Sequence, residues 1–554
     1  MGSITPTSRV LSLLCTLRPA PRDRVTLVSL PSDVLHIILL IIQNADESAE
    51  RLQLQDWTWS EEVFKGVRLI PISETCRYLR EQAMPLIYRE VYNWSRADGN
   101  VWPTTLWPFI VTATLRHRSI RHPKPIIVSN DMFGSLPMMP SLTKVVLRMD
   151  TSIPPGMLEA LSLVPHLRIL DIQRALLDGP PFHLTHSSFA SLETLIICVW
   201  KITDITTISA REVNKQSEYR NVVELLHSVK GILTTLTISG DLLSPHFLSL
   251  KWPHLLKFVV TEHTPTPYLS VPDLTSHMPA LRELSVLFSA DLTRTSTELR
   301  PPFTLGTLDG RPLSDASPHL HTVVLSNIQP DDFIFAQLPR GLDALHIRAT
   351  GDIYIPQASL QTTSLGEAPL TSLTVFTVIQ HVSCLTELTQ LSLMLDHFPT
   401  ATIIEAIAKA CPALRFLELE ALGYNRGNVP TDVRDSALIA PLAQLTHLAQ
   451  LRVSLDFYAS EPPDLYVPEM PMFQRGPHES AARWFFFHHP SLQSVAFPWQ
   501  LWTSWRSFLP LERTVWATYE RRFFPLDRPL TPPISFEDSE SDNGIEPELI
   551  PESF

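Results

Sequence analysis

Three short stretches share one apolar spacing: L-T-K-V-V-L at residues 142–147, L-R-I-L-D-I at 167–172 and L-E-T-L-I-I at 192–197. Each has apolar residues at its first, fourth and sixth positions, and neighbouring stretches begin 25 residues apart. In a short strand, the fourth and sixth side chains point to one face and the fifth points to the other. One such strand cannot bury its apolar face alone, whereas stacked units bury a continuous core. The spacing therefore predicts an array of repeats.

The same spacing recurs along most of the chain and gives thirteen candidate repeats. Several of them open with Pro-x-Leu, and the segments at 402–410 and 435–448 have the pattern of helices. An ordinary α/β domain with apolar strands is the alternative, but it does not explain the recurring Pro-x-Leu. The other ten candidates are Leu233-Leu236-Ile238, Leu255-Phe258-Val260, Leu281-Leu284-Val286, Leu320-Val323-Leu325, Leu342-Leu345-Ile347, Leu370-Leu373-Val375, Leu388-Leu391-Leu393, Leu414-Leu417-Leu419, Leu448-Leu451-Val453 and Leu492-Val495-Phe497.

This pattern resembles a leucine-rich-repeat horseshoe, which implies an α/β solenoid with a parallel sheet on its concave side. The asparagine that the family carries after the third apolar residue is absent, so we expect an irregular solenoid with uneven curvature. In each repeat, the residue between the last two apolar positions should be the most exposed one on the concave face. The polar members of this set form the candidate target-binding face: Asp171, Thr237, Ser285, His346, Ser392, Glu418 and Arg452.

A second kind of apolar stretch stands near the front of the chain, L-P-S-D-V-L-H-I-I-L-L-I-I at residues 30–42. From Val34 to Ile42 every residue except His36 is apolar, and a helix that is apolar all round needs cover on more than one side. The run is too short to cross a bilayer, which takes about 20 residues. Apolar residues at helical spacing in 72–92 can cover one side. The remaining side is a candidate docking surface for another protein.

The pattern Leu30-Pro31-x-Asp33-Val34-Leu35-x-x-Ile38-Leu39, followed by Ser73-x-x-Cys76-Arg77-x-Leu79-Arg80, resembles an F-box. The resemblance implies a small all-α domain over residues 28–92 that docks the Skp-type linker subunit of cullin–RING ubiquitin ligases. A helical hairpin that belongs to the neighbouring fold is the alternative. The positions that contact the linker subunit in this family fall on Leu30, Pro31, Val34, Leu35, Ile38 and Leu79.

We therefore expect an α/β chain in five parts. A flexible lead (1–27) precedes the F-box-like domain (28–92), a linker with capping helices (93–135), the solenoid with its C-terminal cap (136–527) and a disordered acidic tail (528–554). Inserts at 202–221, 291–317 and 457–478 interrupt the array. The last has the composition of a recognition loop, with a flexible insertion as the alternative. The tryptophans near the C-terminal end should close the core, with a target pocket as the alternative.

The composition excludes several classes of function. Five widely spaced cysteines, with no C-x-x-C pair, indicate the reduced thiols of an intracellular protein of the cytoplasm or nucleus and no zinc site. A net charge of −13 argues against a general nucleic-acid binder. No motif for nucleophilic, metal or phosphate chemistry is present, so we expect no enzyme activity, no cofactor, no metal and no membrane contact.

Joining the two halves predicts an adaptor. The F-box-like helices would bind the Skp-type subunit, and through it a cullin–RING ligase, while the repeats hold an unknown protein target. A leucine-rich-repeat scaffold or inhibitor without a ligase is the alternative. A divergent enzyme would require a cleft with buried ionisable groups.

Overall fold

The strands form one sheet whose spatial order follows the chain from β1 to β15. The computed structural model describes residues 30–53, 69–94, 103–117, 130–149, 152–154, 156–173, 175–184, 189–198, 205–262, 269–288, 305–306, 312–326, 328, 331–348, 370, 372–395, 398–421, 436–455, 475–499 and 515–523. Every neighbouring pair of strands is parallel except β14 and β15, which are antiparallel. The predicted parallel sheet is therefore confirmed, in a mixed α/β chain.

The strands are short and similar in length. They are β1 (Glu90–Trp94), β2 (Thr112–His117), β3 (Lys144–Met149), β4 (Ile169–Gln173), β5 (Thr194–Cys198), β6 (Thr235–Ser239), β7 (Lys257–Glu262), β8 (Glu283–Phe288), β9 (Thr322–Ser326), β10 (Ala344–Arg348), β11 (Gln390–Leu395), β12 (Phe416–Ala421), β13 (Gln450–Val453), β14 (Ser494–Trp499) and β15 (Val515–Glu520).

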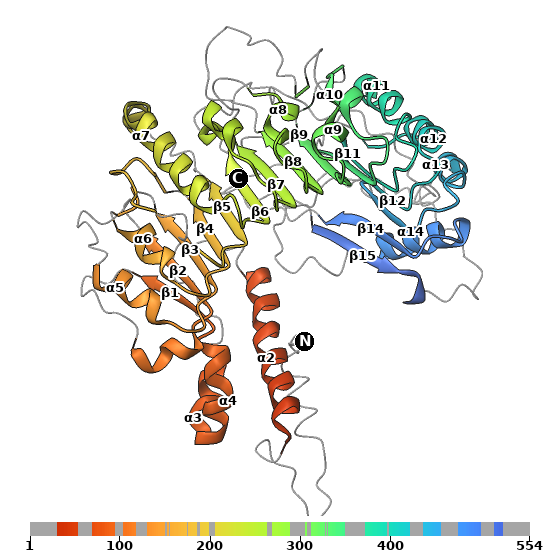
Figure 1. Ribbon diagram of the computed structural model, residues 1–554. Coiled ribbons are helices and arrows are strands. Elements are labelled where there is room, and N and C mark those ends of the chain that lie inside the picture. The colour runs from red at the N-terminus through yellow and green to blue at the C-terminus, as the bar shows by residue number, and fades with distance from the viewer. Residues whose placement is uncertain are drawn as a thin grey trace, which may run out of the picture.

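Helices return the chain from one strand to the next on the outer side. Figure 1 shows an open arc with the strands along its inner side and the helices along its outer side. The longer helices are α2 (Ser32–Gln53), α3 (Leu69–Thr75), α4 (Arg77–Ile87), α7 (Ile205–Val229), α11 (Ser372–Val382), α12 (Ala401–Ala410), α13 (Ser436–Leu442) and α14 (Arg475–His488). The shorter ones are η2 (Thr104–Phe109), α5 (Asn130–Ser135), η3 (Leu136–Met138), α6 (Met157–Ser162), η4 (Gly240–Leu242), η5 (Pro245–Ser249), α8 (Val271–Thr275), α9 (Leu313–Ala316), α10 (Ile334–Gln337) and η8 (Arg521–Phe523).

A two-to-one hydrogen-bond pattern at the start of each strand explains the apolar spacing. The Thr143 carbonyl accepts from both Arg168 N (2.8 Å) and Ile169 N (3.0 Å), and the same pattern recurs from β2 to β14. Two residues opposite one is the arrangement of a β-bulge. In an uninterrupted strand, Leu167 and Leu170 would point to opposite faces because they are three residues apart. The extra residue lets both point inward, and both are buried.

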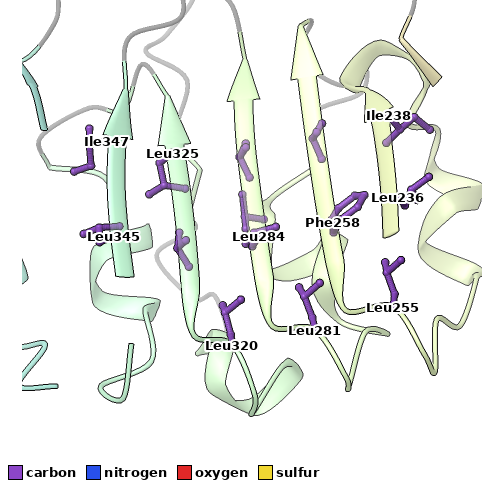
Figure 2. Close-up of a cluster of buried hydrophobic side chains, with 14 of the residues drawn as sticks. Leu236, Ile238, Leu255, Phe258, Leu281, Leu284, Leu320, Leu325, Leu345 and Ile347 are labelled. Carbon is purple, nitrogen blue, oxygen red and sulfur yellow. The ribbon is translucent and has the colours of Figure 1, made fainter. Parts of the chain in front are cut away.

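Twelve of the thirteen candidate repeats supply strands whose three apolar residues are all buried in one continuous core. Figure 2 shows how side chains from successive strands, among them Leu236, Phe258, Leu284 and Leu345, line up on one side of the sheet. Each strand shares its apolar face with the next, so the core runs along the array as it does in a repeat solenoid.

The candidate Leu370-Leu373-Val375 is wrong. Only Leu370 forms an isolated β-bridge, with Leu395, and the other two positions belong to α11. In α11, residues 375, 378, 379 and 382 are buried at helical spacing. A first-to-fourth apolar spacing fits a helix as well as a bulged strand, and the local spacing does not separate the two.

The array also begins earlier than predicted. β1 crosses the predicted boundary between the all-α domain (28–92) and the linker with capping helices (93–135), and β2 lies within that linker. Ile110, Ala113 and Leu115 are buried with the same first, fourth and sixth spacing, so this stretch is a repeat. The sequence pattern did not predict this repeat, because a small residue, Ala113, occupies its central apolar position. The sheet therefore starts at Glu90 and not near residue 136.

The first predicted insert is largely helical. Residues 205–221 form the first part of α7. The last part of this helix packs in the main core through Val222, Leu225, Leu226 and Val229. Most of the insert at 457–478, parts of the insert at 291–317, the lead at 1–27 and the tail at 528–554 lie outside the described residues.

Candidate functional site

α2 has one covered face and one exposed face. It packs on α3 and α4 through a cluster separate from the main core, which we call the helical cluster: Leu35, Leu39, Leu69, Leu79, Ala83, Leu86 and Ile87. On another side of the helix, Val34, Ile37 and Ile41 are 39%, 55% and 52% exposed. Spacings of three and four residues place these side chains on one face. We call these three residues the α2 stripe.

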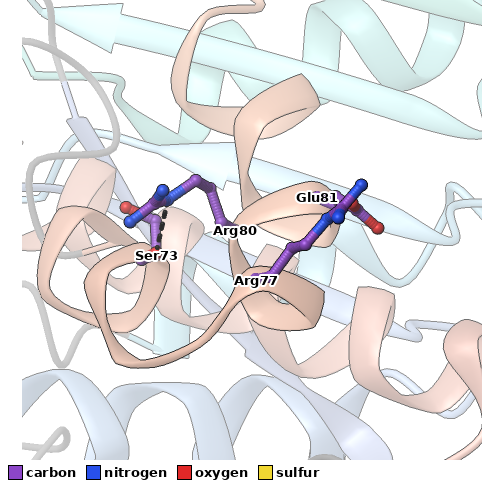
Figure 3. A network of polar contacts seen from close by, with 4 residues as sticks. All are labelled: Ser73, Arg77, Arg80 and Glu81. Atoms are coloured by element: carbon purple, nitrogen blue, oxygen red, sulfur yellow. Dashed lines mark hydrogen bonds and ion pairs between the residues drawn. The ribbon is translucent and has the colours of Figure 1, made fainter.

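Polar contacts hold α3 and α4 in place. Arg80 Nε donates to the Ser73 carbonyl at 3.2 Å and so ties the first turn of α4 to α3 (Figure 3). Arg77 and Glu81 form an ion pair at 2.8 Å one turn apart on α4. Both of these side chains are exposed, and such pairs contribute less than about 1 kcal/mol. The cluster beneath them, and not this ion pair, keeps the helices together.

The predicted linker-contacting residues divide between the two faces. Leu35 and Leu79 are buried in the helical cluster, where they hold α2 on α4 and are not open to a partner. Pro31 and Val34 are exposed, and Leu30 and Ile38 are partly buried. That any of them contacts a partner stays a prediction.

The prediction did not include Ile37 and Ile41, which are the two most exposed residues of the stripe. Their spacing from Val34 was visible in the sequence. In a run that is apolar all round, however, spacing does not say which side its own neighbours cover.

On the sheet, the predicted target-binding residues do form one line. Strand register pairs each of them with its counterpart on the next strand, which gives a central row: Val146, Asp171, Ile196, Thr237, Val259, Ser285, Val324, His346, Ser392, Glu418, Arg452 and Ala496. Their alternation with buried core residues puts them on the face opposite the core. The structure thus brings all seven predicted residues together on the concave side.

The expectation that this row is the most exposed part of each repeat is wrong. Asp171, Ser392 and Glu418 are buried. Neighbouring strands are only about 4.8 Å apart, and the residues two places before and after each row position stand beside it. On a concave surface these side chains converge and cover one another. The row is therefore a packed floor rather than a set of projecting side chains.

One polar cluster occupies β11 to β13. Ser392 Oγ donates to Glu418 Oε1 at 2.7 Å, and Arg452 Nη1 donates to Glu418 Oε2 at 2.9 Å. The Arg452 guanidinium also lies 5.3 Å from the centre of the Phe416 ring. Both oxygens of the buried carboxylate therefore have a partner, as a buried charge requires.

A second polar cluster occupies β3 and β4. Arg148 Nε donates to Gln173 Oε1 at 3.0 Å, and Gln173 Nε2 donates to Asp171 Oδ2 at 2.9 Å. Asp171 Oδ1 is buried without a hydrogen-bond partner in the described part of the chain. Burial raises the pKa of the Asp171 carboxyl, while the Gln173 hydrogen bond and the charges of Lys144 and Arg148 oppose the shift. Between the two clusters, the central row is uncharged from Ile196 to Val324.

His346 adds a titratable group to this floor. Its pKa is lowered, mainly by burial and further by Arg348 and Arg452, while Glu418 acts in the opposite direction. The unfolded chain then binds more protons than the folded chain, so stability is lost as pH falls below the unfolded value of 6.5. We expect His346→Gln to reduce the drop in free energy of unfolding between neutral and acidic pH, as measured by urea denaturation.

The matched control for this prediction is His447→Gln, which removes an exposed histidine ahead of β13. It should keep the pH dependence of the unmodified protein. An unchanged pH dependence in His346→Gln would show that His346 does not couple folding to pH.

The C-terminal end of the array is closed by aromatic packing. Phe485 and Phe486 of α14 and Phe497 of β14 belong to the main core, and Trp484 and Tyr519 pack against it. Trp499 and Trp516 lie in β14 and β15, and Trp502 and Trp505 lie outside the described residues. α14 and β15 therefore cover the last parallel strand of the sheet.

The described residues contain no cluster of three or more His, Cys, Asp or Glu that could hold a metal ion. Within the same part of the chain, no helix combines the length and apolar character that a membrane span requires. The two surfaces that stand out are the α2 stripe and the concave floor, and both suit protein binding.

Comparison with known proteins adds little to this description. No protein-family model matches the sequence, and a search of curated proteins gives no match. The chain is distantly similar to the structure titled "Crystal structure of Rad7 and Elc1 complex in yeast", at 17% identity and a TM-score of 0.31, covering 78% of this chain and 95% of that one. It is also similar to a Bacteroides fragilis protein at 12% identity and a TM-score of 0.24, covering 57% and 68%. Both TM-scores are too low to carry an argument about fold or function.

Proposed function

We propose that this chain is the substrate-recognition adaptor of a Skp–cullin–F-box ubiquitin ligase. In this proposal the exposed side of α2 docks the Skp-type linker subunit and the concave floor holds a protein target. The observation that carries the proposal is the α2 stripe, a row of large apolar side chains that the molecule's own packing leaves open to solvent.

The stripe supports docking for an energetic reason. Burying a valine or isoleucine side chain fully contributes about 1.5–3 kcal/mol. Val34, Ile37 and Ile41 forgo much of this contribution in the isolated chain, although Leu35 and Leu39 on the same helix are fully buried. An apolar stripe on a helix suits a partner that lays apolar groups along it. We take the Skp-type subunit as that partner because the sequence of this region resembles an F-box.

The open sheet supports the second half of the proposal. β1 and β15 are the two edges of the sheet and do not pair with each other, so the strands form an open arc and not a closed barrel (Figure 1). A target held there while the other end of the chain binds a ligase would lie close to the ubiquitin-charged subunit. Tethering of this kind raises effective concentration and needs no chemistry from the adaptor. The proposal places the protein in the cytoplasm or nucleus and assigns it no enzyme activity.

A scaffold that uses the array alone is the second candidate. It is favoured by the short connection between α4, which ends at Ile87, and β1, which starts at Glu90. The helices therefore adjoin the first edge of the sheet and could serve only to cover it. Binding of the linker subunit separates the two candidates.

The deciding experiment is co-expression of the full chain with a Skp-type subunit, followed by size-exclusion chromatography. We expect the two proteins to elute together as a 1:1 complex. The reference is an established F-box protein expressed with the same subunit. If that reference forms its complex and this chain elutes alone, the adaptor proposal fails and the scaffold remains.

A further inference from the structure

The concave side of β10 carries a cation that has no partner among the described residues. Leu345 and Ile347 point into the core, so Ala344, His346 and Arg348 face the concave side. Arg348 is exposed, and its side chain has no hydrogen bond or ion pair with any residue that the structure describes. Several other basic side chains of this face differ: Lys257 pairs with Glu283 at 2.7 Å, and Arg148, Lys144 and Arg452 lie by the two polar clusters.

The nearest carboxylate of the central row does not pair with Arg348. The nearest carboxylate of the central row, Glu418 on β12, is already engaged by Ser392 and Arg452 through its two oxygens. The pKa of the His346 ring is lowered mainly by burial, and Arg348 and Arg452 lower it further while Glu418 opposes the shift. Glu418 is thus engaged by Arg452, and Arg348 has no hydrogen-bond or ion-pair partner among the described residues.

An uncharged strip leads away from Arg348 toward β6. The central row there consists of Val324, Ser285, Val259 and Thr237, each paired in register with the next. His346 continues the same line on β10, next to Val324. Four strand intervals of about 4.8 Å make a strip of about 19 Å, which an extended segment of about six residues would cover.

We infer that the concave face recognises an extended segment of the target in which an acidic side chain pairs with Arg348 and small, uncharged residues lie on the strip from β9 to β6. The inference rests on the proposed function, in which this face holds the target. An arginine and a carboxylate can pair through two parallel hydrogen bonds, which adds geometric specificity to the charge.

The local charge favours a carboxylate over a phosphate group. A phosphorylated residue carries a charge of about −2 near neutral pH. Arg348 offers a single positive charge, because the charge of Arg452 is already paired with Glu418. A single aspartate or glutamate matches the site without such an excess.

Peptide selection on the full-length protein tests the inference. A phage library of random twelve-residue peptides is panned against four proteins: the unmodified chain, Arg348→Gln, Arg348→Glu and Arg340→Gln. Arg340 is an exposed arginine in the turn before β10, which makes its substitution the matched control. Thermal melts verify that all four proteins are equally folded.

We expect the unmodified chain and Arg340→Gln to select peptides with an aspartate or glutamate beside a run of small uncharged residues. Arg348→Gln should bind the best of them about tenfold more weakly or worse, since a hydrogen bond between charged groups is lost. Arg348→Glu should shift the selection toward lysine and arginine. The inference is overturned if no peptide is selected, if no acidic preference emerges, or if Arg348→Gln binds as the unmodified chain does. It is also overturned if phosphoserine in place of the acidic residue binds more tightly.

Linker binding, measured on the same four proteins, separates this inference from the proposed function. All four should form the complex with the Skp-type subunit, because Arg348 lies on β10 and the α2 stripe lies ahead of the sheet. Complex formation without peptide selection would refute the inference alone. Acidic peptide selection without complex formation would refute the ligase role and leave the concave site in place.

Discussion

Replacing Ile37 and Ile41 together by aspartate is expected to weaken binding of the Skp-type linker subunit by at least about a hundredfold. Each isoleucine is more than half exposed in the isolated chain and would be covered in the complex. The double substitution removes two apolar contacts of about 1.5–3 kcal/mol each and leaves two carboxylates to be desolvated at the interface. A hundredfold change corresponds to about 2.7 kcal/mol, so the estimate is conservative. Isothermal titration calorimetry with the purified subunit measures it.

Two further variants show whether the loss is specific. Leu163→Asp changes another exposed apolar residue, in the turn after α6 and away from the stripe, and should bind as the unmodified chain does. Leu35→Asp buries a charge in the helical cluster and should lose binding together with stability. The Ile37/Ile41 variant should keep its melting temperature, because both positions are on the surface. Undiminished binding by that variant would show that the stripe is not the docking surface.

Truncating Phe258 to alanine is expected to lower the free energy of unfolding by about 3–5 kcal/mol. Phe258 is fully buried in β7. Its ring stacks on Phe247, with 5.6 Å between centroids, and Phe247 lies equally close to Trp252. The substitution leaves a cavity under the middle of the sheet, and the loss of stability grows with the volume that the neighbouring side chains do not fill. Urea denaturation followed by circular dichroism gives the change in stability.

The shape of the transition carries further information. In a stacked array each unit contacts mainly its neighbours, so a weak unit in the middle uncouples the two halves. We expect the Phe258→Ala transition to broaden or split into two steps, one for each side of β7. Phe376→Ala is the control, because this phenylalanine of α11 is largely exposed and its loss should cost little. A single sharp transition at the original urea concentration would contradict the expectation for Phe258.

Local spacing predicted most of the sheet and failed where spacing is ambiguous. Twelve apolar triplets became strands because a bulged start lets both the first and the fourth residue face the core. The triplet at Leu370 failed because the same spacing also suits the inner face of α11. β2 was missed because Ala113 holds a place that other repeats give to larger residues. β15 was missed because it is the one antiparallel strand.

The candidate sites were likewise predictable from the sequence only in part. Strand alternation was enough to name the members of the central row, since the side of a strand on which a residue lies depends on its position in that strand. Alternation was not enough to predict that Asp171 and Glu418 are buried, because their cover comes from neighbouring strands and from the concave curvature. The pairing of Glu418 with Arg452 joins residues 34 positions apart.

The spacing of apolar residues was enough to predict an array of short parallel strands behind an apolar N-terminal helix. The periodicity of apolar residues indicates which side chains are buried, and it can be read from neighbouring positions in the sequence. Only the tertiary structure decided that Leu35 and Leu39 are the covered side of α2 and that Ile37 and Ile41 are the open one. It also decided that Arg348 stands unpaired on the concave floor among the described residues. Exposure and charge pairing depend on which distant segments pack beside a residue, and the sequence on either side of that residue does not specify them.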